Sequence, residues 1–173
     1  MVLETDKIRI ELTKPDYLST IIEIEKDNSN YIGQYDFSEH IAVIKSDNEQ
    51  HLSIFDKSNN LLIGHVILSG LKNKNDSIEF RRIVVSRKEK GFGKESIKLI
   101  KEYCFQELRA HRIWLDVFEN NDRAIGLYKS QGFKTKGLLR DSIKQNGHYR
   151  SLKIMSILAN DSYSDTPLQE DHL

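Results

Sequence analysis

The alternation of apolar and polar positions divides the chain into short strands and amphipathic helices. Ile8–Leu12 alternates apolar and charged residues, which is the period of a half-buried strand. Ile97, Ile100, Cys104 and Leu108 recur three or four residues apart, which is the spacing of one helix face. The pattern predicts strands over 8–12, 51–56, 61–71, 78–85, 113–118, 133–143 and 149–157, and helices after Pro15, over 37–46, after Gly93 and over 123–130.

Local signals fix several of these boundaries. Pro15 suits the first turn of a helix, and Asp36 with Glu39 three residues later forms a capping box for another. Residues 57–60 and the dipeptide Asn146-Gly147 are hairpin turns, the second being the strongest such signal in the chain. The resulting order of strands and helices predicts an α+β fold with a central mixed sheet rather than a doubly wound repeat.

Composition narrows the class of protein. A chain of 173 residues is expected to be one domain, and it is long enough to bury a full core without disulfides or structural metal. There are 26 Lys and Arg against 26 Asp and Glu, so a generally basic nucleic-acid binder is not expected. No apolar run approaches a membrane span or a secretion signal, and the single Cys104 suits a reducing compartment. We therefore expect a cytoplasmic protein that binds neither membrane nor nucleic acid.

Charge is unevenly distributed along the chain. Residues 1–158 carry 26 basic against 22 acidic side chains, whereas 159–173 carry four acidic side chains and neither Lys nor Arg. The polar end lacks hydrophobic periodicity, so we expect a folded domain over 1–158 and a frayed acidic tail over 159–173. The six histidines show no close pair with metal-ligand spacing, and we predict no metal site.

A glycine-bearing turn follows the strand that ends at Val85. Its sequence, Lys88-Glu89-Lys90-Gly91-Phe92-Gly93-Lys94, precedes a predicted helix, whose first N–H groups are unpaired and carry partial positive charge. Such a turn can cradle a phosphate, and the lysines add charge. Ser96 stands where a dinucleotide-binding loop has its third glycine, and Lys88 and Glu95 do not fit a Walker loop. The turn alone leaves a phosphate site and a plain strand-to-helix connection equally open.

A second motif follows the next predicted strand and carries a resemblance. Asn121, Ala124, Tyr128, Gly132 and Phe133 occupy the pattern Asn-x-x-Ala-x-x-x-Tyr-x-x-x-Gly-Phe about thirty residues after the glycine turn. Together the two motifs resemble the GCN5-related N-acetyltransferase (GNAT) superfamily. The hairpin over 137–150 further resembles the branch of ribosomal-protein N-terminal and spermidine acetyltransferases. Lys88 stands where that family usually has Gln or Arg.

The resemblance implies a mixed, mostly antiparallel sheet flanked by helices, and acetyl transfer from acetyl-CoA to an amine of a small molecule or a peptide N-terminus. It implies that the glycine turn holds the pyrophosphate of CoA. It also implies that backbone N–H groups at 83–85 polarise the thioester carbonyl, beside an open strand edge that pairs with the pantetheine arm. The residues assigned to the cofactor are Ile83, Val84, Val85, Lys88, Lys90, Gly91, Phe92, Gly93, Lys94 and Asn121.

Two residues are candidates for proton transfer. Tyr128 holds the family position of the acid that protonates the leaving thiolate, although its spacing also fits a core aromatic. Glu79 is the candidate base for the acceptor ammonium, although it also reads as an outward-facing strand residue. Asn121 can contact the cofactor, cap the helix that starts at Asp122, or do both. Cys104 lies on the apolar helix face, which favours core packing over a nucleophilic role.

The acceptor and the assembly stay open at this stage. Tyr31 and Tyr35, in the polar stretch 27–36, either line the acceptor site or pack its lid, and the Asn146-Gly147 hairpin is expected opposite them. The sequence leaves open a homo-oligomer, an acyl-CoA-binding module without turnover, and a phosphate-binding domain unrelated to CoA. A thermal response to CoA distinguishes the last from the first two, and turnover separates those.

Overall fold

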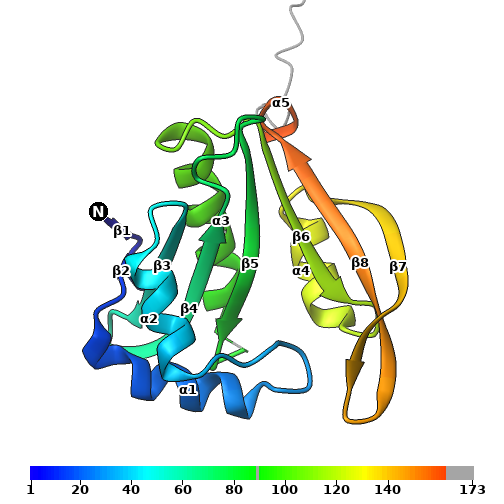
Figure 1. Ribbon diagram of the computed structural model, residues 1–173. Coiled ribbons are helices and arrows are strands. Elements are labelled where there is room, and N and C mark those ends of the chain that lie inside the picture. Colours follow the sequence, from blue (N-terminus) through cyan, green and yellow to red (C-terminus); the bar gives the residue numbers. More distant parts are fainter. Residues whose placement is uncertain (89, 163–173) are drawn as a thin grey trace, which may run out of the picture.

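Eight strands form one mixed sheet in the computed structural model of the chain, which describes residues 1–88 and 90–162 (Figure 1). The strands are β1 (Val2–Glu4), β2 (Ile8–Leu12), β3 (Glu49–Asp56), β4 (Leu61–Ser69), β5 (Ser77–Val85), β6 (Arg112–Phe118), β7 (Lys134–Gln145) and β8 (His148–Leu158). Their order across the sheet is β1-β2-β3-β4-β5-β6-β8-β7. β5 and β6 are parallel, and the other neighbouring pairs are antiparallel, which confirms the predicted α+β class.

The helices lie on both faces of this sheet (Figure 1). They are the single 3₁₀ turn Pro15–Tyr17, α1 (Leu18–Asp27), α2 (Phe37–Lys45), α3 (Phe92–Gln106), α4 (Asp122–Ser130) and the short α5 (Ala159–Ser162). α1 and α2 cover one face of β3 to β5, and α3 packs on the other face against β2 and β5. No helix within the described ranges 1–88 and 90–162 is long and apolar enough to cross a membrane.

The predicted elements are found with small shifts of their ends. The capping box is present, since Asp36 Oδ1 accepts from the N–H of Glu39 at 2.8 Å and the Glu39 carboxylate accepts from the N–H of Asp36 at 2.8 Å. Asn146 and Gly147 both have positive φ, as a tight hairpin turn between β7 and β8 requires. β1 was not predicted, because a three-residue strand is too short to show a period.

The core lies between the sheet and α3. Ile97, Ile100 and Cys104 of the predicted helix face are buried there against strand residues such as Ile10 and Ile54. Cys104 is fully buried, and burial raises the pKa of its thiol, which matches the predicted packing role. Leu108, the last residue of that predicted face, lies beyond the end of α3 and is only partly buried.

The expected tail begins with an ordered turn. Ala159–Ser162 forms α5, where the Asp161 carboxylate accepts from the N–H of Leu158 at 3.2 Å and lies 3.7 Å from Lys134 Nζ. The remaining part of the predicted tail, 163–173, lies outside the described residues.

β5 and β6 are separated along most of their length. They are paired only where Ser77–Glu79 lies beside Arg112–Trp114. Beyond that point β5 continues as far as Val85 beside β4, while β6 follows β8 over its whole length. The two halves of the sheet therefore diverge like an open V (Figure 1), and the edge of β5 that faces β6 is free from Phe80 onward.

Candidate active site

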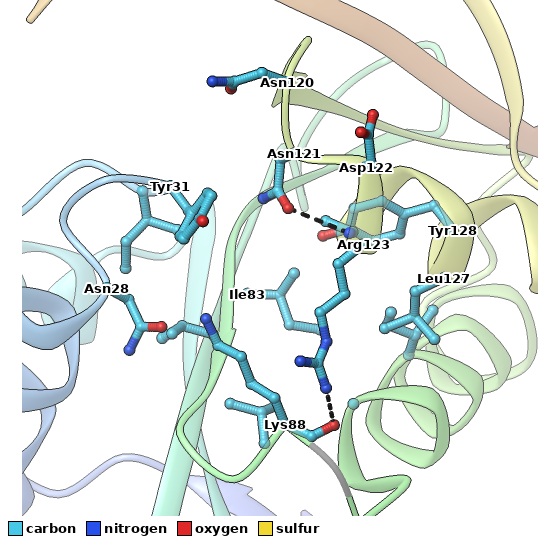
Figure 2. Close-up of a pocket in the computed structure, with 16 residues that line it drawn as sticks. Asn28, Tyr31, Ile83, Lys88, Asn120, Asn121, Asp122, Arg123, Leu127 and Tyr128 are labelled. Atoms are coloured by element: carbon cyan, nitrogen blue, oxygen red, sulfur yellow. Dashed lines mark hydrogen bonds between the residues drawn. The ribbon is translucent and has the colours of Figure 1, made fainter.

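A cleft of about 390 Å³ occupies the V between β5 and β6 (Figure 2). It is lined by Asn28, Tyr31, Ile32, Ile83, Val84, Val85, Lys88, Gly93, Ile97, Asn120, Asn121, Asp122, Arg123, Ala124, Leu127 and Tyr128. These residues come from the segment after α1, the end of β5 and the turn after it, the first two turns of α3, the turn that follows β6, and α4. The cleft therefore exists because the strands diverge and leave main chain and side chains unpaired on both sides.

The first turn of α3 presents unpaired N–H groups. Gly91 precedes the helix with φ of +77°, a left-handed conformation that glycine adopts at little cost, and no side chain caps α3. By contrast, Asp36 caps α2 and Asn121 caps α4. An uncapped helix start offers its N–H groups and partial positive charge to an anion, so this end of the cleft fits a phosphate group.

Two cationic side chains reinforce that end. Arg123 donates a hydrogen bond to the backbone carbonyl of Lys88, and both residues line the cleft (Figure 2). Burial, followed by the neighbouring charge of Arg123, lowers the pKa of Lys88, and its Nζ lies 5.1 Å from the centre of the Tyr31 ring. A polyanion would relieve this repulsion. Lys88 and Arg123 could therefore hold an anion at this end of the cleft.

α3 and α4 approach closely beside this end. A Cβ on Gly93 would lie 3.2 Å from Leu127 Cδ2, so a larger residue there would require the Leu127 side chain to shift by a few tenths of an ångström. Gly93 therefore allows the first turn of α3 to contact the Leu127 side chain of α4.

Tyr128 lies where the walls of the cleft meet. Its side chain is buried, and its ring packs edge-on to Phe133 with 5.6 Å between ring centroids. Burial, and then the charge of Asp116, raise the pKa of the phenol. Tyr128 is thus protonated at neutral pH and can donate a proton within the cleft.

Two carboxylates lie near the point where the strands part. Glu79 is the last β5 residue paired with β6, and its Oε2 accepts hydrogen bonds from Arg81 Nε at 3.3 Å and Arg81 Nη2 at 3.2 Å. Burial raises the pKa of Glu79 and of Asp116, and the charge of Asp116 raises the pKa of Glu79 further. A carboxylate with a raised pKa is a better proton acceptor at neutral pH.

The free edge of β5 forms one wall through the residues that end the strand. Ile83, Val84 and Val85 line the cleft, while the other edge of β5 pairs with β4. β4 approaches so closely that a Cβ on Gly64 would lie 2.2 Å from the carbonyl oxygen of Val84. This contact fixes the end of β5, and its open edge can pair with an extended chain of amide groups as an added strand would.

The structure gathers part of the predicted set of site residues in one place. The members that line the cleft are Tyr31, Ile83, Val84, Val85, Lys88, Gly93, Asn121 and Tyr128. Glu79, Lys90, Gly91 and Lys94 are not among the lining residues. Phe92 does not line the cleft either: its side chain is buried in the core, and its backbone N–H belongs to the first turn of α3.

Two further predictions concern single side chains. Asn121 caps α4, since its Oδ1 accepts from the N–H of Ala124 at 3.3 Å, and it also lines the cleft. Tyr35, expected either to line the acceptor site or to pack its lid, is not among the residues that line the cleft. Its ring stacks on the Arg82 guanidinium at 4.0 Å and meets His40 edge-on. It supports the wall from behind.

Sequence reasoning missed several residues of the site. Arg123 directly precedes the motif residue Ala124, and Leu127 directly precedes the motif residue Tyr128. Their helical spacing from Asn121 and Tyr128 could have indicated that they belong to the site. Asn28, which donates to the carbonyl of Ile24 at 2.8 Å, and Asp116 gave no pattern that pointed to the cleft.

Behind the cleft lies a buried polar network centred on Glu25 of α1. Its Oε1 accepts from Arg82 Nη1 at 2.8 Å and from His65 Nε2 at 3.0 Å, and its Oε2 accepts from the N–H of Tyr35 at 2.9 Å. Burial alone would raise the pKa of Glu25. Hydrogen bonds from His40, His65 and the Tyr35 N–H, with the charge of Arg82, outweigh burial and hold that pKa well below its usual range.

The network continues away from Glu25 through two more histidines. His40 Nε2 lies 3.3 Å from Glu25 Oε2, His40 Nδ1 lies 2.9 Å from His51 Nε2, and His51 Nδ1 lies 2.9 Å from Thr13 Oγ1. Each imidazole, when neutral, can donate its N–H in the direction of Glu25 and accept a hydrogen bond at its other ring nitrogen. His65 Nδ1 has no donor among residues 1–88 and 90–162. No group of side chains within 1–88 and 90–162 has the arrangement of a metal site.

Known proteins resemble this chain in sequence. A family model described as "Acetyltransferase (GNAT) family" matches residues 16–133. The probable N-acetyltransferase YjcK of Bacillus subtilis is 29% identical over 126 residues, which cover 72% of this chain and 70% of that protein. The spermidine N(1)-acetyltransferase of Vibrio cholerae is 33% identical over 113 residues, which cover 65% of each chain.

A solved structure extends the match beyond the aligned sequences. The crystal structure of spermidine N-acetyltransferase from Vibrio cholerae in complex with CoA and spermine superimposes with a TM-score of 0.81 at 25% identity. The match covers 91% of this chain and 99% of that one. The likeness therefore includes the segments on either side of the family match.

Proposed function

This chain belongs to the acetyltransferase (GNAT) family, and from that premise we propose that it transfers the acetyl group of acetyl-CoA to a primary amine of a polyamine. The observation that carries the proposal is the cleft itself. It joins a phosphate-binding helix start, an open strand edge and a buried tyrosine in one continuous space. The polyamine as acceptor is supported by the spermidine and spermine named for the relatives.

The residues present fit acetyl-CoA. The uncapped start of α3, Lys88 and Arg123 would hold the pyrophosphate, and the free edge of β5 at 83–85 would pair with the amide groups of the pantetheine arm. Bound acetyl-CoA supplies the thioester whose carbonyl the amine attacks. A backbone N–H at the open edge is placed to stabilise the oxygen of that carbonyl, an effect of about 2.7–4 kcal/mol in other oxyanion sites.

Proton transfer is the task of the side chains at the apex of the V. A primary amine with a pKa near 10.4 loses its proton at pH 7 at a cost of about 4.6 kcal/mol. Glu79, whose pKa burial raises, takes that proton directly or through water, and Asp116 supports it by disfavouring a second negative charge nearby. Tyr128, which is protonated at neutral pH, gives a proton to the departing thiolate. Because burial raises the pKa of the phenol, this transfer is uphill and is driven by formation of the product amide.

The direct test follows CoA thiol release from acetyl-CoA with spermidine, spermine, an aminoglycoside, an amino acid and a short peptide, beside CoA-induced thermal stabilisation. Release with spermidine or spermine well above the rate without acceptor is the expected result. CoA stabilisation without release for any amine would indicate a binding module that lacks turnover. The absence of both would contradict the acetyl-CoA site.

The compartment is proposed from the cysteine content. The single cysteine is buried on α3 and free, which suits a reducing compartment. The cytoplasm as the place of action stays a prediction, which fractionation of cells with an antibody to this protein can check.

A further inference from the structure

Arg150 of β8 bridges three segments around the cleft. Its Nη1 donates to the backbone carbonyl of Asn30 at 2.9 Å, and its Nη2 donates to Asn120 Oδ1 at 2.7 Å. The guanidinium also lies over the ring of Phe118, with its carbon atom 3.8 Å from the ring centre. The planar fork of one arginine thus joins the stretch between α1 and α2 to the turn between β6 and α4.

Gln145, across the hairpin turn from Arg150, strengthens the same bridge. Its Oε1 accepts from Arg150 Nη1 at 2.6 Å, and its Nε2 donates to the backbone carbonyl of Ser29 at 2.8 Å. Two consecutive carbonyls, Ser29 and Asn30, are therefore held by the β7–β8 hairpin. We call Arg150 and Gln145 the clasp, and residues 28–36 the α1–α2 segment.

The clasp crosses the end of the cleft that lies away from the phosphate-binding helix. Asn120, held by Arg150, lines the cleft at the end far from the backbone of Lys88 (Figure 2), and Tyr31, whose ring the Lys88 side chain approaches, lies on the opposite wall. A cofactor whose phosphates sit at Lys88 and the start of α3 leaves this other end for the acceptor. The acceptor must therefore pass beside the clasp.

Resting on the proposed function, we propose that Arg150 is a positioning residue that sets acceptor specificity. It draws the α1–α2 segment toward the β6–α4 turn, which narrows the acceptor end of the cleft. An unbranched chain of methylene and amine groups passes such an opening. A peptide N-terminus does not, because a side chain and a second peptide group follow its amine within a few bonds.

The geometry of the guanidinium, rather than its charge, performs this role. Every acceptor of Arg150 is a neutral oxygen, and no carboxylate among residues 1–88 and 90–162 pairs with it. A lysine at 150 would keep the charge but could not donate in two directions from one rigid plane. The Arg150→Lys variant therefore distinguishes a role of the guanidinium's geometry from a role of its charge.

The experiment compares kcat/KM for spermidine with kcat/KM for trialanine, whose N-terminus is free. The wild-type protein is expected to prefer spermidine at least tenfold. In Arg150→Met and in Arg150→Lys that preference falls at least tenfold through KM for the acceptor, while KM for acetyl-CoA is unchanged. Arg140→Met, on the exposed side of β7 in the same hairpin, keeps the wild-type preference.

A folded Arg150→Met protein with the wild-type preference would overturn the inference, and so would wild-type behaviour of Arg150→Lys. Amide hydrogen exchange at 29–32 gives a readout that does not depend on turnover. It should become at least tenfold faster in Arg150→Met and not in Arg140→Met, and equal rates would overturn the clasp. A wild-type protein that stabilises with CoA yet acetylates no amine would instead reject the proposed function, and the specificity inference with it.

Discussion

The two walls of the cleft are held by different kinds of interaction. The phosphate wall, made of the end of β5 and the starts of α3 and α4, depends on strand pairing, helix starts and a glycine turn that are close in sequence. The acceptor wall is the α1–α2 segment, which consists of turns and irregular chain. It is held by Glu25 from inside and by the clasp from outside, and Arg150 lies 120 residues from Asn30.

Because of this difference, substitutions are expected to affect the geometry of the cofactor site and the choice of acceptor separately. The phosphate wall is proposed to bind through backbone groups, so most side-chain substitutions there are expected to leave its geometry in place. The acceptor wall is positioned by a few side chains, so one substitution can alter the acceptor while the cofactor site persists. The following experiments test that separation.

Tyr128→Phe removes the hydroxyl at the meeting point of both walls and is expected to have the largest effect. kcat should fall by roughly 10²–10⁴, because the thiolate loses its proton donor, while CoA affinity is unchanged. Thiol release and CoA-induced thermal shifts measure the two quantities. Tyr149→Phe, on the exposed hairpin, is the matched control, and an unchanged kcat in Tyr128→Phe would remove the phenol from the mechanism.

Glu25→Leu breaks the inner support of the acceptor wall. Arg82 would be left buried without a carboxylate, which costs about 3–5 kcal/mol of unfolding free energy in comparable sites. Urea denaturation at pH 7.5 measures the loss, with Glu23→Leu on the exposed side of α1 as control. Glu25→Leu combined with Arg82→Leu should recover most of it, and a double variant no better than the single one would show that the ion pair is not the cause.

Acid should weaken the same wall. Burial, then repulsion from His65 and His40, lowers the pKa of His51 to about 2, and burial likewise lowers the pKa of His65. Unfolded histidine takes up a proton below pH 6.5 and the buried rings do not. Stability is therefore complete above pH 6.5 and falls as pH decreases, by about 1.4 kcal/mol per pH unit for each histidine.

Urea midpoints at pH 7.5, 6.5 and 5.5 give this slope directly. His51→Gln should flatten it, whereas His148→Gln, on the exposed hairpin, should not. A wild-type stability that is constant down to pH 5 would mean that the buried histidines take up protons in the folded protein over the same pH range as in the unfolded chain.

Substitutions of single charges in the phosphate wall should have the smallest effect. Lys88→Ala and Arg123→Ala are each expected to weaken CoA binding about two- to fivefold, since exposed charge pairs contribute up to about 1 kcal/mol. Calorimetric titration with CoA at 50 and 300 mM salt should show the difference shrinking as salt rises. Lys98→Ala on the outer side of α3 is the control, and a hundredfold loss from one lysine would contradict a site led by backbone groups.

The phosphate wall was largely predictable from sequence, since its signals are local. The cap at Asn121, the turn at Gly91 and the strand that ends at Val85 each depend on neighbouring residues. His40, His51 and His65 carried no such signal. They come together only because α2 packs on β3 and because β3 and β4 pair in a register that sets Ser53 opposite His65.

The same reasoning explains why the clasp could not be foreseen. Arg150 and Gln145 show an ordinary polar strand pattern, and their partners are backbone carbonyls far away in sequence. The stacking of Tyr35 on Arg82 could not be foreseen for a related reason. A tyrosine in a polar stretch gives no hint that a buried arginine lies behind it.

Because β8 lies between β6 and β7 in the sheet, the strands become able to pair in a defined order during synthesis. Strands that precede the V can pair as they leave the ribosome, because β1 to β5 are neighbours in sequence and in the sheet. β6 gains its antiparallel partner only after residue 158 has been synthesised. At about 5–20 residues per second, β6 waits seconds with one edge unpaired, and the nascent chain contains the α1–α2 segment and the phosphate wall before it contains the clasp that holds that segment in place.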